Sequence, residues 1–329
     1  MKNIFTLILV LSTSIILAQD SLKSKLSLEG SIDTYYKRNL STNNTGLSPA
    51  TSFANGNGFS LGMFNLISSY ESGKTGFVAD LVYGPRGEDA VFLSTGSSNI
   101  INQLYAYWYV NDKVTLTMGN FNTFLGYEVI SPVGNFNYST SYMFSYGPFS
   151  HSGLKADFTL SENFTAMLSV LNATDATDFN PTNFNTLGVQ LGYKGTYLNA
   201  LYGKQDASLE PTFQIDLTGG YNLSKKFYLG INSTYNDTEG SGFYGVALYP
   251  QYNLGKLTAG LRGEYFAEKG SGVGAIGADA NVINFTSTLD YAIENLNLKL
   301  EYRIDKASEQ VFENKNNLSS IILAAVYSF

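Results

Sequence analysis

Apolar and polar residues alternate strictly over residues 296–304, which read Leu-Asn-Leu-Lys-Leu-Glu-Tyr-Arg-Ile. Successive side chains of a β-strand point to opposite faces, so this pattern predicts a strand with one apolar and one polar face. The period of two returns along the chain, and no apolar run after the N-terminus approaches the ~20 residues of a membrane helix. A sheet of such strands requires apolar matter on one side and water on the other. A β-barrel that stands in a bilayer around an aqueous lumen meets this requirement.

The N-terminus has the pattern of a secretory signal peptide. Lys2 provides a positive charge, residues 4–17 form an apolar stretch, and Ala18 is a small residue suited to cleavage. We therefore predict a signal peptide over residues 1–19 and a single outer-membrane β-barrel domain over residues 20–329.

The composition narrows the class of protein further. Charged residues make up 14% of the chain, against ~25% in an average soluble domain, whereas 24 Tyr and 22 Phe are present. The formal net charge of −7 argues against nucleic acid as a partner, because nucleic-acid binding requires basic patches. The sequence contains no cysteine, which excludes disulfides, thiolate metal sites and cysteine nucleophiles. No cofactor, metal site or catalytic residue is predicted.

Turn residues divide the chain into segments that are joined alternately by short and long connections. Short turns that contain Gly, Asn, Asp or Ser are predicted near 72–74, 111–113, 161–163, 194–195, 223–225, 254–256 and 294–295. Longer polar stretches fall at 38–57, 84–98, 122–150, 172–183, 204–211, 236–241, 267–280 and 305–317. Bacterial outer-membrane barrels have short periplasmic turns, long extracellular loops and an even number of strands. The segments therefore predict an all-β, transmembrane antiparallel up-and-down barrel of about 16 strands.

Residues 319–329 form a last alternating strand that stops on an aromatic residue. Its apolar side chains fall at 321, 323, 325, 327 and 329. This strand resembles the C-terminal signature of bacterial outer-membrane proteins. The resemblance implies that the barrel-assembly machinery recognises Phe329, and that the protein resides in the lipid of a Gram-negative outer membrane.

The region 117–160 carries a more specific likeness. Residues 119–130 (GNFNTFLGYEVI), 135–139 (NFNYS) and 144–156 (FSYGPFSHSGLKA) resemble the OmpL-like β-barrel porins that are common in Bacteroidetes. The resemblance implies an outer-membrane porin, a passive diffusion channel for small polar solutes or ions through a water-filled lumen. Porins of about 16 strands often form trimers, so by analogy a homotrimer is expected.

The same region contains the longest predicted connection, the third long loop at 122–150. A loop of this length is expected to have a function of its own. By analogy with general porins, whose third loop narrows the barrel, we predict that residues 122–147 constrict the lumen. A loop that only packs over the mouth, or against a neighbouring subunit, is the alternative.

Strand alternation also predicts which charged residues face the lumen, because a charged side chain in lipid costs about 2–4 kcal/mol at mid-depth. Arg262, Lys299 and Arg303 form a predicted basic patch on the wall, and Glu128 of the third loop is its acidic opponent. Such facing charges would set a transverse field that favours small polar solutes. Alternatively, they pair with wall carboxylates and only solvate the wall. The predicted pore-lining residues are Glu128, Asp157, Arg262, Glu264, Asp290, Lys299, Glu301 and Arg303. The segments 57–70 and 241–253 have no clear apolar face, and no facing is predicted for them.

The sequence is also compatible with two other functions. The single histidine, His151, lies between Ser150 and Ser152, so an outer-membrane hydrolase with His151 as base and one of these serines as nucleophile is an alternative. A structural or adhesive surface barrel is another. The segment 272–277 matches G-x-G-x-x-G, but a predicted strand follows it where a dinucleotide site requires a helix, so we predict an outer loop there.

Overall fold

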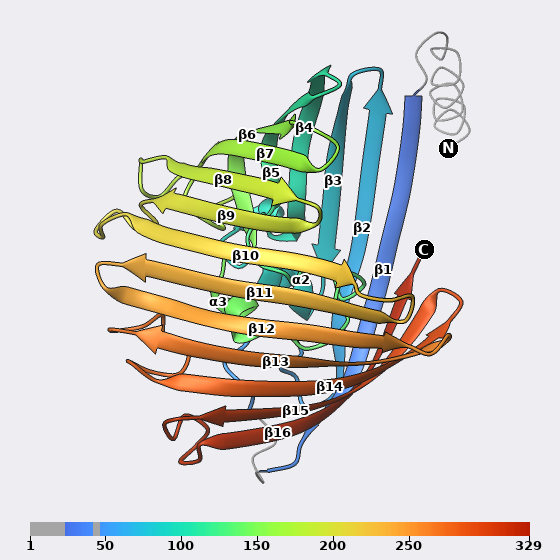
Figure 1. Ribbon diagram of the computed structural model, residues 1–329, viewed down its shortest axis with the longest axis vertical. Coiled ribbons are helices and arrows are strands. Elements are labelled where there is room, and N and C mark those ends of the chain that lie inside the picture. Colours follow the sequence, from blue (N-terminus) through green and yellow to red (C-terminus); the bar gives the residue numbers. More distant parts are fainter. Residues whose placement is uncertain (1–23, 42–46) are drawn as a thin grey trace, which may run out of the picture.

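The computed structural model describes residues 24–41 and 47–329, so the predicted signal peptide at 1–19 lies outside the described residues. The described residues form sixteen strands, each antiparallel to its neighbours, and β1 pairs with both β2 and β16 to close a barrel (Figure 1). This confirms the predicted fold class and strand number.

The strands and the short helices have the following bounds. The strands are β1 Ser24–Asn39, β2 Gly58–Ser72, β3 Thr75–Tyr83, β4 Ile101–Asn111, β5 Val114–Asn122, β6 Ser150–Thr159, β7 Phe164–Leu171, β8 Thr186–Tyr193, β9 Thr196–Gly203, β10 Thr212–Asn222, β11 Phe227–Thr238, β12 Ser241–Asn253, β13 Leu257–Lys269, β14 Asn281–Ile293, β15 Leu296–Ala307 and β16 Asn317–Ser328. The helical elements are α2 Pro85–Ala90, the 3₁₀ helix η1 Gly96–Ile100 and α3 Tyr142–Tyr146. Among residues 24–41 and 47–329, no helix has the length and apolar character to cross a membrane.

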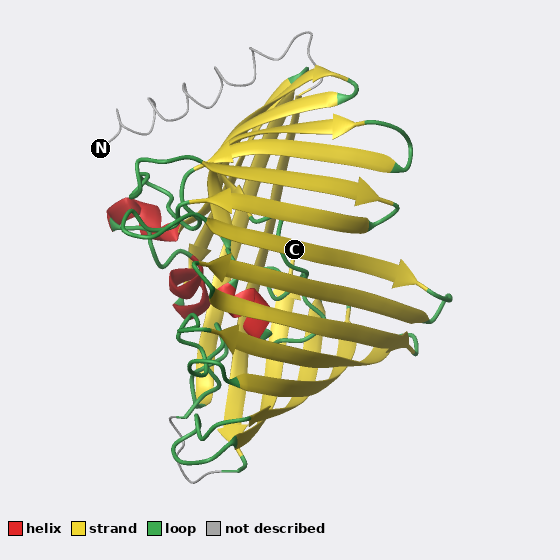
Figure 2. Cartoon of the chain, turned by 60° about the vertical axis from the view of Figure 1, so that its left-hand side comes forward, coloured by secondary structure: helices red, strands yellow, loops and turns green. Residues whose placement is uncertain are grey.

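The connections alternate between short turns at one end of the barrel and longer loops at the other (Figure 2). All seven short turns lie where the turn residues predicted them. The long loops also agree, except that the expected loop at 236–241 is wrong. There β11 and β12 are joined by the tight turn Glu239-Gly240, in which both residues have positive φ (51° and 85°). Such a two-residue turn matches the twist of the flanking strands, so the polar residues before it continue the strand.

Alternation along β15 separates a lipid-facing side from an inner side, as its sequence predicts. Leu300 is 42% exposed on the outside of the barrel, whereas the adjacent Glu301 is 0% exposed. β10 follows the same rule, with Phe213, Ile215 and Leu217 outside and Gln214 and Asp216 buried inside. The outward apolar faces are the ones that a bilayer would cover.

The two segments without a predicted facing are explained by the structure. In β2, a bulge opposite Asp33 reverses the alternation: Phe59 and Leu61 point outward before it, and Phe64 after it. The Asp33 carboxylate accepts a hydrogen bond from the Met63 amide (2.9 Å) at this bulge. In β12 the inward side chains, such as Phe243 and Ala247, are apolar like the outward ones, so the sequence alternation does not distinguish the two faces.

The barrel closes at the C-terminus. The Phe329 amide donates to the Gly30 carbonyl at 2.9 Å, and the Gly30 amide donates to the Phe329 carbonyl at 3.0 Å. A Cβ atom on Gly30 would lie 2.4 Å from the Phe329 ring, so only glycine leaves room for the ring over β1. The terminal residue therefore extends the seam between β1 and β16.

Candidate functional site

The loop between β5 and β6, residues 123–149, packs against the inner faces of distant strands. Most of its residues are buried, although loops normally run over the protein surface. Its short helix α3 contacts β12 and lies within the outline of the barrel in Figure 1. Met143 and Tyr142 of α3 share an apolar cluster with Phe243, Ala247 and Phe266 of the wall. The apolar inner face of β12 therefore serves as the contact surface for this loop.

Two wall carboxylates accept hydrogen bonds from loop amides. Glu301, on β15, accepts from the Tyr138 amide at 2.8 Å and from the Ser139 amide at 3.3 Å. Glu264, on β13, accepts from the amides of Tyr142 at 3.0 Å and Met143 at 2.8 Å. Both carboxylates are buried. They replace water as acceptors for amides that lack a secondary-structure partner.

Two wall arginines donate hydrogen bonds to the loop carbonyls that lie between these amides. Arg262, on β13, donates to the Ser139 carbonyl, and Arg303, on β15, donates to the Thr140 carbonyl at 2.8 Å. Arg303 is itself held by Asp305, whose two carboxylate oxygens each lie 2.8 Å from a guanidinium nitrogen. The wall thus presents acceptors where the loop has amides and donors where it has carbonyls. An irregular segment can therefore be buried with its polar backbone satisfied.

Glu128 connects the loop to the wall and to its own helix. Its Oε1 lies 2.8 Å from Nη1 of Arg262, and both side chains are almost completely buried. Its Oε2 accepts from the amide and the hydroxyl of Ser141, at 2.7 and 2.5 Å. The same hydroxyl accepts from the Phe144 amide at 3.1 Å and so caps α3. One carboxylate therefore orders both the ion pair and the first turn of the helix.

Lys299 holds the other end of the loop. Its ammonium group donates to the carbonyls of Pro132 at 3.4 Å, Asn135, and Phe136 at 3.1 Å, which uses all three of its donors. Oδ2 of Asp290 lies 3.8 Å from the same nitrogen. Three carbonyl dipoles thus surround this buried cation.

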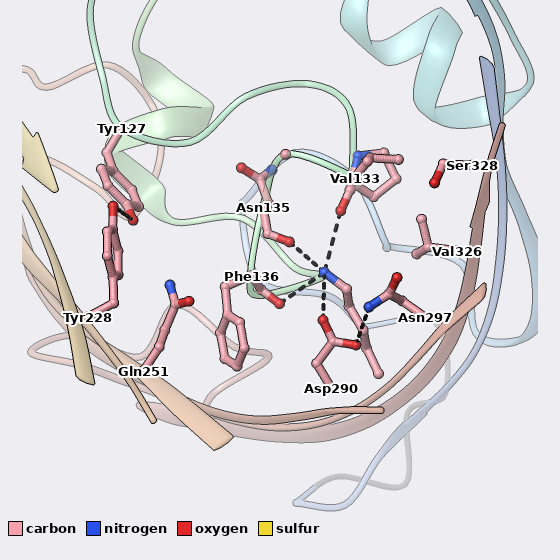
Figure 3. A pocket seen from close by; sticks show the side chains of 13 residues that line it. Tyr127, Val133, Asn135, Phe136, Tyr228, Gln251, Asp290, Asn297, Val326 and Ser328 are labelled. Atoms are coloured by element: carbon pink, nitrogen blue, oxygen red, sulfur yellow. Dashed lines mark hydrogen bonds and ion pairs between the residues drawn. The ribbon is translucent and has the colours of Figure 1, made fainter. Parts of the chain in front are cut away.

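A cavity of about 490 Å³ opens beside this end of the loop (Figure 3). In Figure 3, the ring of Phe136 lies between Gln251 and Asp290. The Asn297 side-chain amide donates to Asp290 at 2.8 Å. The barrel residues that line the cavity come from the parts of β11, β12, β14, β15 and β16 that adjoin the short turns and the C-terminus. The cavity therefore lies on the short-turn side of the loop.

A second short helix, α2, also contacts the loop. Arg86 of α2 donates to the carbonyls of Ile130 at 3.2 Å and Tyr138 at 3.1 Å. Its guanidinium group lies 3.7 Å from an oxygen of Asp33 and stacks over the rings of Phe53 and Tyr138. The sequence reasoning missed Arg86. Its only signal was a single arginine inside a polar loop, beside a glycine and a proline that begin a helix.

Burial raises the pKa of the Tyr138 phenol, so this loop group stays protonated. Its hydroxyl donates to Asp33, the same carboxylate that lies near Arg86 and fills the β2 bulge. The loop, α2 and the bulge therefore share one buried carboxylate.

The structure brings most of the predicted pore-lining residues together, but beneath the loop. Arg262, Glu264, Lys299, Glu301 and Arg303 point inward and are at most 3% exposed, because loop atoms cover them. Glu128, the predicted opponent of the basic patch, meets it by direct contact and not across an open gap. Asp290 reaches the cavity. Asp157 stands apart on β6, where it pairs with Lys155 at 3.0 Å and keeps 41% of its side chain exposed.

The residues of the hydrolase alternative do not form a catalytic pair. His151 and its two serine neighbours lie on β6, where adjacent side chains point to opposite faces. The ring nitrogen Nε2 of His151 lies 2.9 Å from the Thr123 hydroxyl, and the Ser152 hydroxyl donates to Asn120 at 3.0 Å. Phe124 packs on the imidazole at 4.9 Å between ring centres. Within the described chain, Nδ1 of His151 has no hydrogen-bond partner.

Solved structures with the same architecture are outer-membrane proteins. The channel DcaP of Acinetobacter baumannii aligns with a TM-score of 0.63 at 14% identity, over 93% of this chain and 97% of that one. An anion-selective porin from Comamonas acidovorans aligns with a TM-score of 0.64 at 12% identity, over 93% and 100% of the two chains. OccK1 of Pseudomonas aeruginosa gives 0.51 at 10% identity, over 93% and 98%. At these identities the likeness concerns the fold.

The sequence itself matches a known family. No curated protein sequence matches this chain. The family described as "Putative beta-barrel porin-2, OmpL-like" matches residues 25–329, which is nearly the whole chain. This confirms the resemblance seen in residues 119–156. The chain therefore belongs to the OmpL-like beta-barrel porin family and is a porin channel of the bacterial outer membrane.

Proposed function

We propose that this porin is a passive diffusion channel for small polar solutes, whose lumen is narrowed by the loop at 122–150. The observation that carries the proposal is the binding of the loop backbone over residues 138–143 by four inward-facing charges of β13 and β15. A loop held in this way occupies cross-section that would otherwise be water.

The energetics of these contacts favour a fixed loop over a flap that opens readily. Withdrawal of the loop would leave buried charges without their partners, and breaking one buried ion pair by removing a partner costs about 3–5 kcal/mol. The Arg262–Glu128 pair and the Lys299 ammonium group would both lose contacts. The proposed channel therefore filters by a permanent width.

The inner surface that remains is suited to polar solutes. Tyr228, Gln251, Asn297 and Asp290 offer hydroxyl, amide and carboxylate groups to the cavity beside the loop. Such groups exchange hydrogen bonds with water and with hydrated solutes, while an apolar solute would gain no partner.

Liposome swelling with a graded panel of neutral sugars tests this proposal. Vesicles containing the protein are expected to swell fastest with pentoses, more slowly with hexoses and least with trisaccharides, because the constriction discriminates by size. Vesicles without protein are the control. Absence of swelling with every sugar would contradict a diffusion channel, and equal rates for all sizes would contradict a narrow lumen.

We infer that the protein acts without hydrolysis, since His151 and the adjacent serines point to opposite faces of β6. The purified protein is expected to hydrolyse neither lipid esters nor peptides. Hydrolysis that is present in the wild type and lost in His151→Ala would establish the enzyme alternative.

We further propose two partners, namely the assembly machinery and two further copies of this chain. The seam contacts of Phe329 with Gly30 support a role of the terminal residue in barrel closure, and deletion of Phe329 is expected to lower the yield of folded protein in the outer membrane. One similar structure, OmpT of Vibrio cholerae, is described in a trimer form. A native mass of three chains would support the homotrimer, and a mass of one chain would contradict it.

A further inference from the structure

We propose that the lumen favours cations over anions, and that Asp290 is a specificity-determining residue on the short-turn side of the loop. The inference rests on the proposed diffusion channel and names the class of solute that this channel prefers. It follows from which charges are neutralised in the interior and which are not.

The buried arginines are all compensated by carboxylates. Among the described residues, the three buried arginines lie 2.8 Å (Arg262), 2.8 Å (Arg303) and 3.7 Å (Arg86) from a carboxylate oxygen. The Lys299 ammonium group is surrounded by three carbonyl oxygens and has Asp290 at 3.8 Å. The basic patch of the wall therefore offers no free positive charge to an anion in the lumen.

Several buried carboxylates, in contrast, accept only from neutral donors. Asp80 accepts from the amide side chains of Asn102 at 2.7 Å and Gln103 at 2.9 Å. Asp216 accepts from the Gly126 amide at 3.0 Å and the Asn199 side chain at 2.8 Å. Neutral donors stabilise a carboxylate without cancelling its charge.

Glu268 extends this pattern towards the extracellular end of β13. Four backbone amides of the segment 273–277 donate to its carboxylate at 2.5 to 3.0 Å. The glycine-rich segment 272–277, which matches G-x-G-x-x-G, thus surrounds the carboxylate of Glu268. Like Glu264 and Glu301, Glu268 has no cation within 4 Å in the described part of the chain.

The cavity beside the loop, which lies on the proposed solute path, has the same imbalance between accessible negative and positive charge. Its two charged lining residues are Asp290 and Lys299, and the Lys299 nitrogen is turned towards the loop carbonyls. Asp290 lies at the cavity wall with Asn297 on one oxygen (Figure 3). Oδ2 of Asp290 lies 3.8 Å from the Lys299 nitrogen, beyond hydrogen-bond distance, and Oδ1 accepts from the neutral Asn297 amide. A cation in the cavity therefore meets a carboxylate to which no ammonium group donates, whereas an anion meets an ammonium group that already donates to three carbonyls.

Among the described residues, Lys37 on β1 is the remaining buried cation, and its ammonium group donates to the Ser48 hydroxyl at 3.1 Å. This one positive charge stands against five buried carboxylates without a cation within 4 Å, namely Asp80, Asp216, Glu264, Glu268 and Glu301, so the interior carries an excess of negative charge. Low-dielectric walls focus the field of such charges into the lumen, which raises the local concentration of cations and lowers that of anions. This expectation differs from the behaviour of the similar porin from Comamonas acidovorans, which is anion-selective.

Reversal potentials in planar bilayers under a KCl gradient at pH 8 test the inference. The wild type is expected to give a K⁺/Cl⁻ permeability ratio above 1. One charge about 8 Å from the ion path, partly screened at 0.1 M salt, changes this ratio about twofold. Asp290→Asn is therefore expected to lower the ratio about twofold. Asp157→Asn, which neutralises an exposed inner carboxylate, is expected to lower it as well and serves as a second variant should Asp290→Asn fail to assemble.

Asp112→Asn is the matched control, because it removes the same charge at a short turn outside the lumen. It is expected to leave the ratio unchanged. Open channels with a ratio of 1 or less would overturn the selectivity and leave the diffusion channel intact. An Asp290→Asn ratio equal to that of the wild type would overturn the role of Asp290. Absence of any conductance would refute the proposed channel itself.

Discussion

The ion pair between Arg262 and Glu128 gives the sharpest energetic prediction. Arg262→Met removes the guanidinium group that pairs with Glu128, which is 4% exposed. The Glu128 carboxylate then keeps only the amide and hydroxyl of Ser141 as donors. An unpaired buried charge of this kind costs about 3–5 kcal/mol. The docked loop should therefore open about 100- to 4,000-fold more often, since each 1.4 kcal/mol is tenfold. In Arg262→Met/Glu128→Gln the charge is absent, and most of this loss should be recovered.

Thiol labelling measures the opening directly, because the chain has no natural cysteine. A single cysteine in place of Met143, which is 3% exposed in the docked loop, is protected until the loop leaves the wall. Its labelling rate at low reagent concentration follows the population of the open state. A rate in Arg262→Met less than tenfold above that of the cysteine background would refute the reasoning. A double variant that labels as fast as the single variant would refute it equally.

Two further predictions concern other contacts. Gly62→Ala places a Cβ atom 1.7 Å from Asp33 at the β2 bulge and should destabilise the barrel by about 1–3 kcal/mol. The control Gly263→Ala places a Cβ atom that meets no other atom within 4 Å and should have little effect. Equal urea midpoints for the two variants would contradict the role of the bulge. Burial raises the pKa of Asp175, in the β7–β8 loop, to about 6 in spite of two amide donors. The unfolded chain therefore releases this proton at lower pH than the folded barrel does, and the wild type should lose stability as the pH rises from about 4 through 6. The variant Asp175→Asn keeps an oxygen acceptor and tolerates the positive φ of 63°. It should abolish this pH dependence and be about 2–3 kcal/mol more stable than the wild type at pH 7. Parallel curves of stability against pH for the two proteins would show that the carboxyl does not titrate in this range.

The sequence predicted the barrel well because its strands separate lipid from water by a simple rule. Leu300 and Glu301 are neighbours with opposite surroundings, and this contrast is visible in the residues themselves. The rule fails where the inner side is filled by protein. In β12 the inward residues Phe243 and Ala247 pack against the loop, so the strand is apolar on both faces.

The site was predictable only as a set of inward-facing charges. Alternation identified Arg262, Glu301 and Arg303, but it could not show that each would bind the loop backbone. Arg262 and Glu128 are 134 positions apart, and their pairing depends on the path of the loop through the barrel. The role of Arg86 depends on the same path, because its acceptors are the carbonyls of Ile130 and Tyr138.

The single-channel conductance of a variant that lacks residues 128–145 tests the central claim most directly, namely that the loop narrows the lumen. Deletion of residues 206–210, an exposed segment of the β9–β10 loop, is the matched control. If the loop at 122–150 constricts the channel, its shortening should raise the conductance severalfold, while the control deletion leaves it unchanged. A conductance equal to that of the wild type in the first variant, with folded barrels present, would contradict the constriction.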